Sequence, residues 1–177
     1  MAILDRGRIQ QIGAPREVYL RPASRFVAGF IGETNLLSAR VANRDGASVE
    51  LLTPLGTLTS TALPAEPLAA GDEVTLSIRP ESIVLDVPGA ASNAFPAVFR
   101  DSVYLGEIAQ HHIAAGPAAS PQADGTGTVP PAGGAALPPD GTVLKVFELN
   151  PRFAGRTDQL QRTTARVDPK DVVVLTR

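Results

Sequence analysis

The chain has 177 residues, no cysteine and a formal net charge of −2 at pH 7. This composition excludes a disulfide framework and thiolate zinc sites, and it argues against the strong positive field that nucleic-acid binding requires. No apolar run approaches the roughly 18 residues of a membrane span, and the start, MAILDRGRIQ, lacks the apolar core of a signal peptide. We therefore expect a soluble, cytoplasmic chain of one domain or two small ones.

Residues 1–34 predict a short hairpin followed by two short helices. The turn at residues 5–7 ends in glycine and separates two apolar runs. Pro15 suits the first turn of one helix, and Ser24 suits the cap of the next. A lone two-stranded hairpin is marginally stable in water, so we expect this segment to be the end of a larger unit.

The second of these helices has one apolar face. Phe26, Val27, Phe30 and Ile31 lie about one turn apart. This face either docks the helix onto a neighbouring domain or forms part of the core of this one. The sequence leaves both interpretations open.

From Asn35 onward the pattern is that of a β protein. Strands are expected over residues 36–42, 47–52 and 57–61, with turn signals between them. The stretch Val74–Asp86 reads as an alternating strand, a turn at Pro80 and a short apolar strand. Thr75, Ser77 and Arg79 share one face of the first of these strands, opposite Val74, Leu76 and Ile78.

The same layout recurs over residues 164–175, where Pro169 matches Pro80 and Val172 matches Ile83. A pattern that recurs once near the end of each half predicts two similar β units. Further strands are expected over residues 95–105, 107–114 and 142–149. Residues 115–141 hold seven alanines, six prolines and six glycines, so we expect a flexible loop there.

No catalytic, cofactor-binding or metal-binding residue can be assigned from the sequence. Neither of the two lysines, Lys145 and Lys170, follows a glycine, so the Gly-Lys pair of a phosphate-binding P-loop is absent. His111 and His112 are adjacent on an expected strand and should point to opposite faces, one toward the core and one toward solvent.

Several segments resemble a known family. Residues 3–37, ILDRGRIQQIGAPREVYLRPASRFVAGFIGETNLL, resemble the end of the nucleotide-binding domain of ABC-importer ATPases, most closely the spermidine/putrescine type within the carbohydrate and polyamine class. The segments IRPESIVL at residues 78–85 and DPKDVVVL at residues 168–175 resemble the transport-associated OB (TOBE) domain that follows it, as does Tyr104-Leu105-Gly106.

The resemblance implies a mainly β fold, an OB-like barrel or sandwich made of two similar halves. Residues 1–34 would then be the remnant of the nucleotide-binding domain. Residues 35–177 would be the TOBE domain, with halves 35–90 and 91–177 and the flexible loop at 115–141. The family's Walker and signature motifs are absent, so the resemblance implies no ATP hydrolysis by this chain; ATP and Mg belong to the family's full-length subunit.

The implied function is that of an accessory, regulatory domain that supports dimerisation of an importer ATPase. Its partners would be a second copy of the ATPase subunit and, through the motor domain, the transporter's membrane subunits. It would lie at the inner face of the cell membrane. Phe26, Phe30 and Ile31 would anchor the β unit to the motor domain, and the turn around Arg79, Glu81 and Ser82 would offer an interaction surface.

The sequence leaves two alternative functions open. One is an OB domain that senses a small anion or solute. The other is a nucleic-acid-binding OB module, which an aromatic content of 5% and a negative net charge disfavour.

Overall fold

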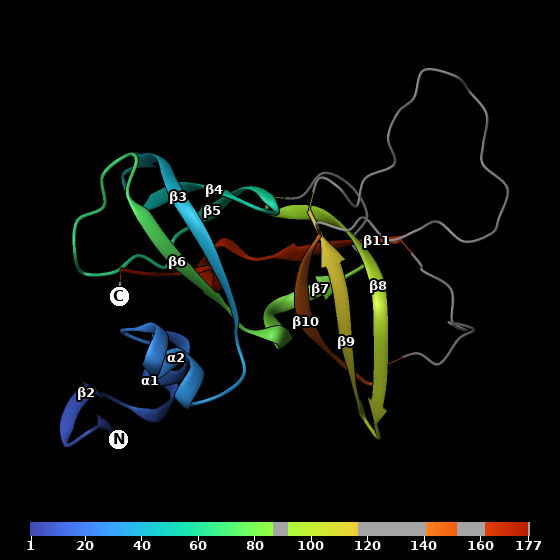
Figure 1. The fold of residues 1–177 in the computed structure, drawn as a ribbon, viewed down its shortest axis with the longest axis horizontal. Helices are drawn as coiled ribbons and strands as arrows, with labels where there is room; N and C mark the ends of the chain where they lie inside the picture. Colours follow the sequence, from blue (N-terminus) through green and yellow to red (C-terminus); the bar gives the residue numbers. More distant parts are fainter. Residues whose placement is uncertain (87–91, 117–140, 152–161, 177) are drawn as a thin grey trace, which may run out of the picture.

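The computed structural model describes residues 1–86, 92–116, 141–151 and 162–176 (Figure 1). Its N-terminal part has the predicted hairpin and two helices: β1 (Ala2–Asp5), β2 (Arg8–Ile12), α1 (Pro15–Leu20) and α2 (Arg25–Phe30). The predicted cap is confirmed, because the Ser24 side chain accepts a hydrogen bond from the Val27 N–H at 3.3 Å. Gly7 takes a φ of 77° in the hairpin turn, a conformation that glycine adopts without steric cost.

The rest of the described chain forms two five-stranded antiparallel sheets. The strand order of the first is β12-β6-β3-β4-β5. Its strands are β3 (Asn35–Asp45), β4 (Ser48–Thr53), β5 (Gly56–Ser60), β6 (Glu73–Ile78) and β12 (Val173–Leu175). The second has the order β10-β9-β8-β11-β7. Its strands are β7 (Ile83–Leu85), β8 (Ala94–Leu105), β9 (Ile108–Ala115), β10 (Thr142–Leu149) and β11 (Arg162–Val167).

The predicted similarity of the two halves is confirmed by the topology. When β3, β4, β5 and β6 are matched with β8, β9, β10 and β11, the two sheets have the same strand order. Both long strands carry a bulge where they pair with the next strand, near Val41 in β3 and near Phe99 in β8. Together with the curled sheets, this gives the mainly β, OB-like fold expected from the sequence.

Each half gives its last short strand to the sheet of the other half. The strand β7 follows β6 in the chain but pairs with β11, and β12 follows β11 but pairs with β6. The turns that make these crossings are the 3-10 helices η1 (Pro80–Ser82) and η3 (Pro169–Asp171). The residues before them have nearly the same conformation, with φ −67° and ψ 140° at Arg79 and φ −67° and ψ 139° at Asp168.

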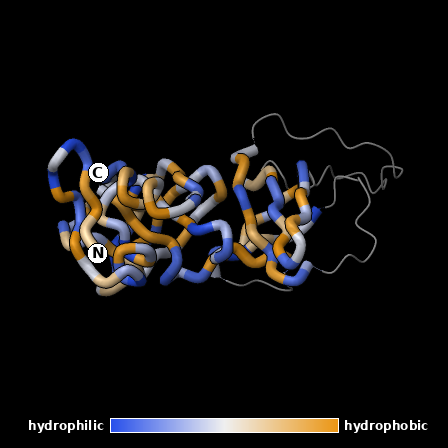
Figure 2. Tube along the Cα trace, turned by 90° about the horizontal axis from the view of Figure 1, so that it is seen from below, coloured by the Kyte–Doolittle hydropathy of each residue, from blue (hydrophilic) through white to orange (hydrophobic). Residues whose placement is uncertain are grey.

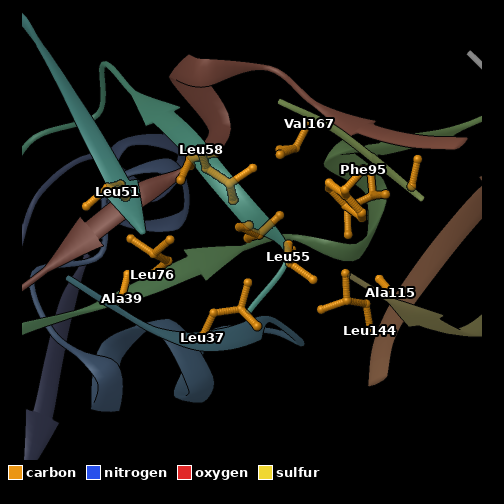
Figure 3. Packing of buried hydrophobic residues seen from close by; sticks show 14 of the residues in the cluster. Leu37, Ala39, Leu51, Leu55, Leu58, Leu76, Phe95, Ala115, Leu144 and Val167 are labelled. Atoms are coloured by element: carbon orange, nitrogen blue, oxygen red, sulfur yellow. The ribbon is translucent and has the colours of Figure 1, made fainter. Parts of the chain in front are cut away.

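One hydrophobic core is shared by both sheets (Figure 3). Leu51, Leu58 and Leu76 enter it from the first sheet, and Phe95 and Leu144 enter it from the second. Each of these side chains is at most 2% exposed, and burial of one side chain of this size contributes about 1.5–3 kcal/mol. Along the chain, hydrophobic stretches are interspersed with hydrophilic ones (Figure 2).

Both faces of β6 hold buried side chains, not only the apolar face that the alternation predicts. Val74, Leu76 and Ile78 are buried in the core as expected, but Ser77 on the opposite face is also only 2% exposed. The helix α2 lies against β6, and its Ala28 packs with Val173 of the neighbouring strand β12. The outer face of β6 is therefore also covered.

Two predictions, the flexible loop and the boundary between the halves, concern residues that lie largely outside the described part of the chain. The flexible loop predicted at 115–141 lies outside the described residues, except for Ala115, Gly116 and Gly141. The predicted strand at 142–149 that follows it is confirmed as β10. The proposed boundary between the halves, after residue 90, also lies outside the described residues.

Candidate functional site at the junction of helices and sheets

The guanidinium group of Arg79 joins the helical segment to the β unit. Arg79 directly follows β6 and is 6% exposed. Its Nη1 donates to three carbonyl oxygens at 2.9–3.0 Å, those of Ala28, Gly32 and Glu33. These carbonyls lie at and just beyond the C-terminal end of α2, where helix carbonyls lack intrahelical partners and a cation is favoured.

Tyr19 of α1 completes this junction. The Arg79 guanidinium carbon lies 4.2 Å from the centre of the Tyr19 ring, and Nη2 donates to the Tyr19 carbonyl oxygen at 3.3 Å. The Tyr19 hydroxyl donates to Oε1 of Glu81 at 2.5 Å. Burial and this hydrogen bond raise the pKa of Tyr19, whereas burial lowers the pKa of Arg79.

The same segment also reaches the second 3-10 turn. Nη1 of Arg21, the residue after α1, donates to the carbonyl oxygen of Lys170 at 3.0 Å. The two equivalent turns, η1 and η3, are therefore both linked to α1 or the residue that follows it. This arrangement fixes the helical segment relative to both halves of the β unit.

Arg79 was expected to contribute to an interaction surface together with Glu81 and Ser82. For Arg79 this expectation is wrong, because α1 and α2 cover its side chain and use its donors within the chain. Glu81 is exposed and accepts the bond from Tyr19, and Ser82 is half-buried. Their role in an interface stays a prediction.

The apolar face of α2 is partly core of this chain and partly exposed, so each of the two interpretations left open by the sequence, core face or docking face, applies to part of it. Val27 is fully buried in a small cluster with Ile3, and Ile31 packs against that cluster. Phe26 and Phe30 are 39% and 63% exposed, and their rings stack with centroids 5.6 Å apart. Part of the face is therefore core, and the stacked phenylalanine pair remains the predicted docking surface.

Exposed apolar side chains are concentrated in the N-terminal segment. Of the fifteen large hydrophobic residues exposed among the described residues, seven lie within residues 1–34. They are Met1, Leu4, Ile9, Ile12, Leu20, Phe26 and Phe30. Single exposed apolar residues are ordinary on a protein surface, but this short segment carries nearly half of those among the described residues.

A groove of about 540 Å³ lies beside the junction, between the end of α2 and the strand β10. An ion pair occupies it, with Nζ of Lys145 2.6 Å from Oε2 of Glu33. His112 and Val143 are among its lining residues. A second groove, of about 580 Å³, lies on the outer face of the first sheet beside Arg25.

The two histidines lie as predicted, on opposite faces of β9. His111 is 1% exposed, whereas the side chain of His112 is 32% exposed. Nδ1 of His111 lies 2.7 Å from Oγ of Ser102, and Nε2 lies 3.1 Å from Oε2 of Glu148. Ser102 of β8, His111 of β9 and Glu148 of β10 therefore form one chain of hydrogen-bonded side chains across three neighbouring strands.

No group of three or more potential metal ligands gathers among the described residues. The helices in that part of the chain are too short to cross a membrane. The sequence did not indicate the roles of Tyr19, Arg21 and Ser102, because each depends on contacts far along the chain. The single available signal was an arginine directly after a strand with one regular apolar face.

Comparison with known proteins supports the resemblance seen in the sequence. No family model matches the chain. It is 41% identical over 113 residues to the spermidine/putrescine import ATP-binding protein PotA 1 of Pseudomonas aeruginosa, and 43% identical over 114 residues to PotA of Ruegeria pomeroyi. Each match covers 64% of this chain and 30% of the relative. PotA of Acidothermus cellulolyticus is 36% identical over 140 residues, which cover 76% of this chain and 36% of that protein.

The resemblance to importer ATP-binding subunits is confirmed. The chain spans about a third of the length of these curated relatives of the PotA type. Among solved structures, it matches the cytoplasmic molybdate-binding protein ModG with a TM-score of 0.55, over 79% of this chain and 94% of ModG. At 16% identity this likeness shows a shared fold alone.

Proposed function

We propose that this chain forms the accessory, regulatory β unit of the ATP-binding subunit of an ABC importer for polyamines or a related solute. The similarity to PotA proteins over about two thirds of the chain carries this proposal. The mainly β fold and the exposed apolar N-terminal segment agree with a domain attached to a larger subunit.

The Arg79 junction supplies a physical route for coupling. Residues 1–34 carry the exposed phenylalanine pair, and Arg79 binds the end of α2 and the end of α1 to the β unit. A motor domain that packs on Phe26 and Phe30 would therefore displace the helices and the β unit together. The β unit would support pairing with a second copy of the subunit, and its own position would follow that of the motor domain.

The chemistry of transport would lie elsewhere in such a subunit. ATP and Mg would be bound by the motor domain, which would also contact the membrane subunits, and this chain would hydrolyse no ATP. The proposed position is the cytoplasmic face of the membrane. Nucleic acid is not proposed as a partner.

A chimera tests this proposal. The 113 matched residues of the Pseudomonas aeruginosa relative are replaced by this chain, and uptake of radiolabelled spermidine is measured in cells that lack their own importer. We expect uptake that depends on ATP and on the inserted chain. A chimera that accumulates to the normal level but transports nothing, while the unaltered relative transports, would contradict the proposal.

Matched variants locate the contact. The double change Phe26→Ser and Phe30→Ser removes the exposed pair and should abolish uptake by the chimera. Leu149→Ser changes a residue that is 69% exposed at the far end of β10, and it should leave uptake intact. Equal loss from both variants would argue against docking through α2.

A second candidate is a domain that senses a small anion or solute. It is favoured by the ModG fold and by the groove that Lys145 and His112 line. The ion pair with Glu33 offsets the charge of Lys145, which weakens this candidate for an anion. Titration calorimetry with molybdate and with spermidine decides it, since binding lost in Lys145→Ala would support a sensor and no heat with either would exclude these ligands.

A further inference from the structure

Two asparagine side chains make the same unusual contact in the two halves of the fold. Asn35 is the first residue of β3 and is 8% exposed. Its Oδ1 accepts the backbone N–H of Lys145 at 2.8 Å, and its Nδ2 donates to the Lys145 carbonyl oxygen, also at 2.8 Å. Lys145 lies in β10, the edge strand of the other sheet.

Asn93 repeats this contact from the second half. It lies just before β8 and is 7% exposed. Its Oδ1 accepts the backbone N–H of Thr59 at 2.6 Å, and its Nδ2 donates to the Thr59 carbonyl oxygen at 2.7 Å. Thr59 lies in β5, the edge strand of the first sheet. Asn93 has a φ of 56°, which asparagine tolerates better than most residues do.

The two contacts are equivalent under the matching of the halves. Each asparagine stands at the start of the first long strand of its own half, and each reaches the edge strand of the other half. A carboxamide has one acceptor and one donor side, so it reproduces the pair of groups that a neighbouring strand offers. The recurrence indicates that the contact belongs to the architecture of the fold.

We propose that the contacts of Asn35 with Lys145 and of Asn93 with Thr59 hold the two halves of the fold in register. We propose that they also close the edges of β10 and β5 to pairing with a second copy of the chain. Each of these two-bond contacts is called a clasp below. An edge strand exposes a row of unpaired N–H and C=O groups that can template pairing. An incoming strand must bond alternate residues in succession. A clasp in the row interrupts that succession at Lys145 and at Thr59.

The test replaces the donor of each clasp with an acceptor. In Asn35→Asp, an oxygen replaces the Nδ2 that donates to the carbonyl oxygens of Lys145 at 2.8 Å and Ile78 at 3.3 Å. In Asn93→Asp, an oxygen faces the carbonyl oxygen of Thr59. We expect Asn35→Asp to speed hydrogen exchange of the Lys145 amide at least about tenfold while Thr59 is unchanged, and Asn93→Asp to do the reverse. Asn43→Asp is the control, because Asn43 is exposed and its Oδ1, which the variant keeps, accepts the backbone N–H of Arg44 at 2.8 Å.

A measurement on the unaltered chain applies even where a variant does not fold. By NMR, the carboxamide protons of Asn35 and Asn93 should exchange with water at least about tenfold more slowly than those of Asn43. The double variant should self-associate at concentrations where the unaltered chain sediments unchanged. Equal carboxamide exchange at all three asparagines, equal speeding of exchange at Lys145 and Thr59 in each single variant, or a double variant that sediments like the unaltered chain would overturn the proposal.

Discussion

Replacing Arg79 by methionine tests the junction between the helices and the β unit. The variant keeps most of the side-chain volume but removes four donated hydrogen bonds, three at 2.9–3.0 Å and one at 3.3 Å. Hydrogen bonds to a charged group contribute about 1.5–3 kcal/mol each. Because the freed carbonyls lie near the helix ends and can regain water, we expect a loss below that sum, about 3–5 kcal/mol of unfolding free energy.

The assay is urea unfolding followed by far-UV circular dichroism, with hydrogen exchange of the α2 amides as a local readout. Arg79→Lys keeps the charge but lacks the planar fork that serves Tyr19 and α2 together, so it should recover roughly half of the loss or less. Arg40→Met is the control. Arg40 is 60% exposed and pairs with Glu73 at 3.2 Å, an interaction that contributes about 0–1 kcal/mol. If Arg79→Met costs no more than Arg40→Met, the junction does not hold the helices.

Three further predictions concern single side chains. Tyr19→Phe should lower the free energy of unfolding by about 0.5–1.5 kcal/mol, because the hydrogen bond to Glu81 is lost. The pKa of Tyr19 is raised in the folded state, so its contribution to stability is full below the ordinary tyrosine pKa and is lost as pH rises through the raised pKa. Ultraviolet titration should show this ionisation in the unaltered chain and not in the variant. The pKa of Asp168 is lowered, first by a backbone hydrogen bond at the start of η3, so its contribution to stability is present above the ordinary aspartate pKa and is lost as pH falls through the lowered one. Asp168→Asn should remove this dependence from an acid unfolding series, and an unchanged acid limb would contradict the assignment. His111→Ala should cost about 2–4 kcal/mol by leaving a cavity and unpaired polar partners, whereas His112→Ala, at the half-exposed neighbour, should stay within about 0.5 kcal/mol in the same urea assay.

Local patterns in the sequence were sufficient to predict most elements. The hairpin, the Ser24 cap and the strands follow from turn residues, capping residues and alternation, all of which act within a few positions. Pro80 and Pro169 mark both crossing turns because proline cannot continue a strand ladder. These signals also predicted that the two halves are alike.

The contacts that join the segments were beyond such patterns. Alternation assigns a strand's faces but not its sheet, so the exchange of β7 and β12 could not be predicted. The clasp of Asn35 on Lys145 spans 110 positions, and the bond from Arg79 to Ala28 spans 51. Both contacts depend on how elements far apart in the chain pack together, and the spacing of residues in a single sequence does not show this.

In the proposed function, the exposed pair on α2, Phe26 and Phe30, packs against the motor domain of an importer ATPase. A photo-crosslinking residue at position 30 of the chimera with the Pseudomonas aeruginosa relative tests it most directly, with the same residue at position 149 as the control. We expect position 30 to crosslink to peptides of the relative's own ATPase region and position 149 not to do so. Absence of such crosslinks from position 30 in a chimera that transports spermidine would contradict it.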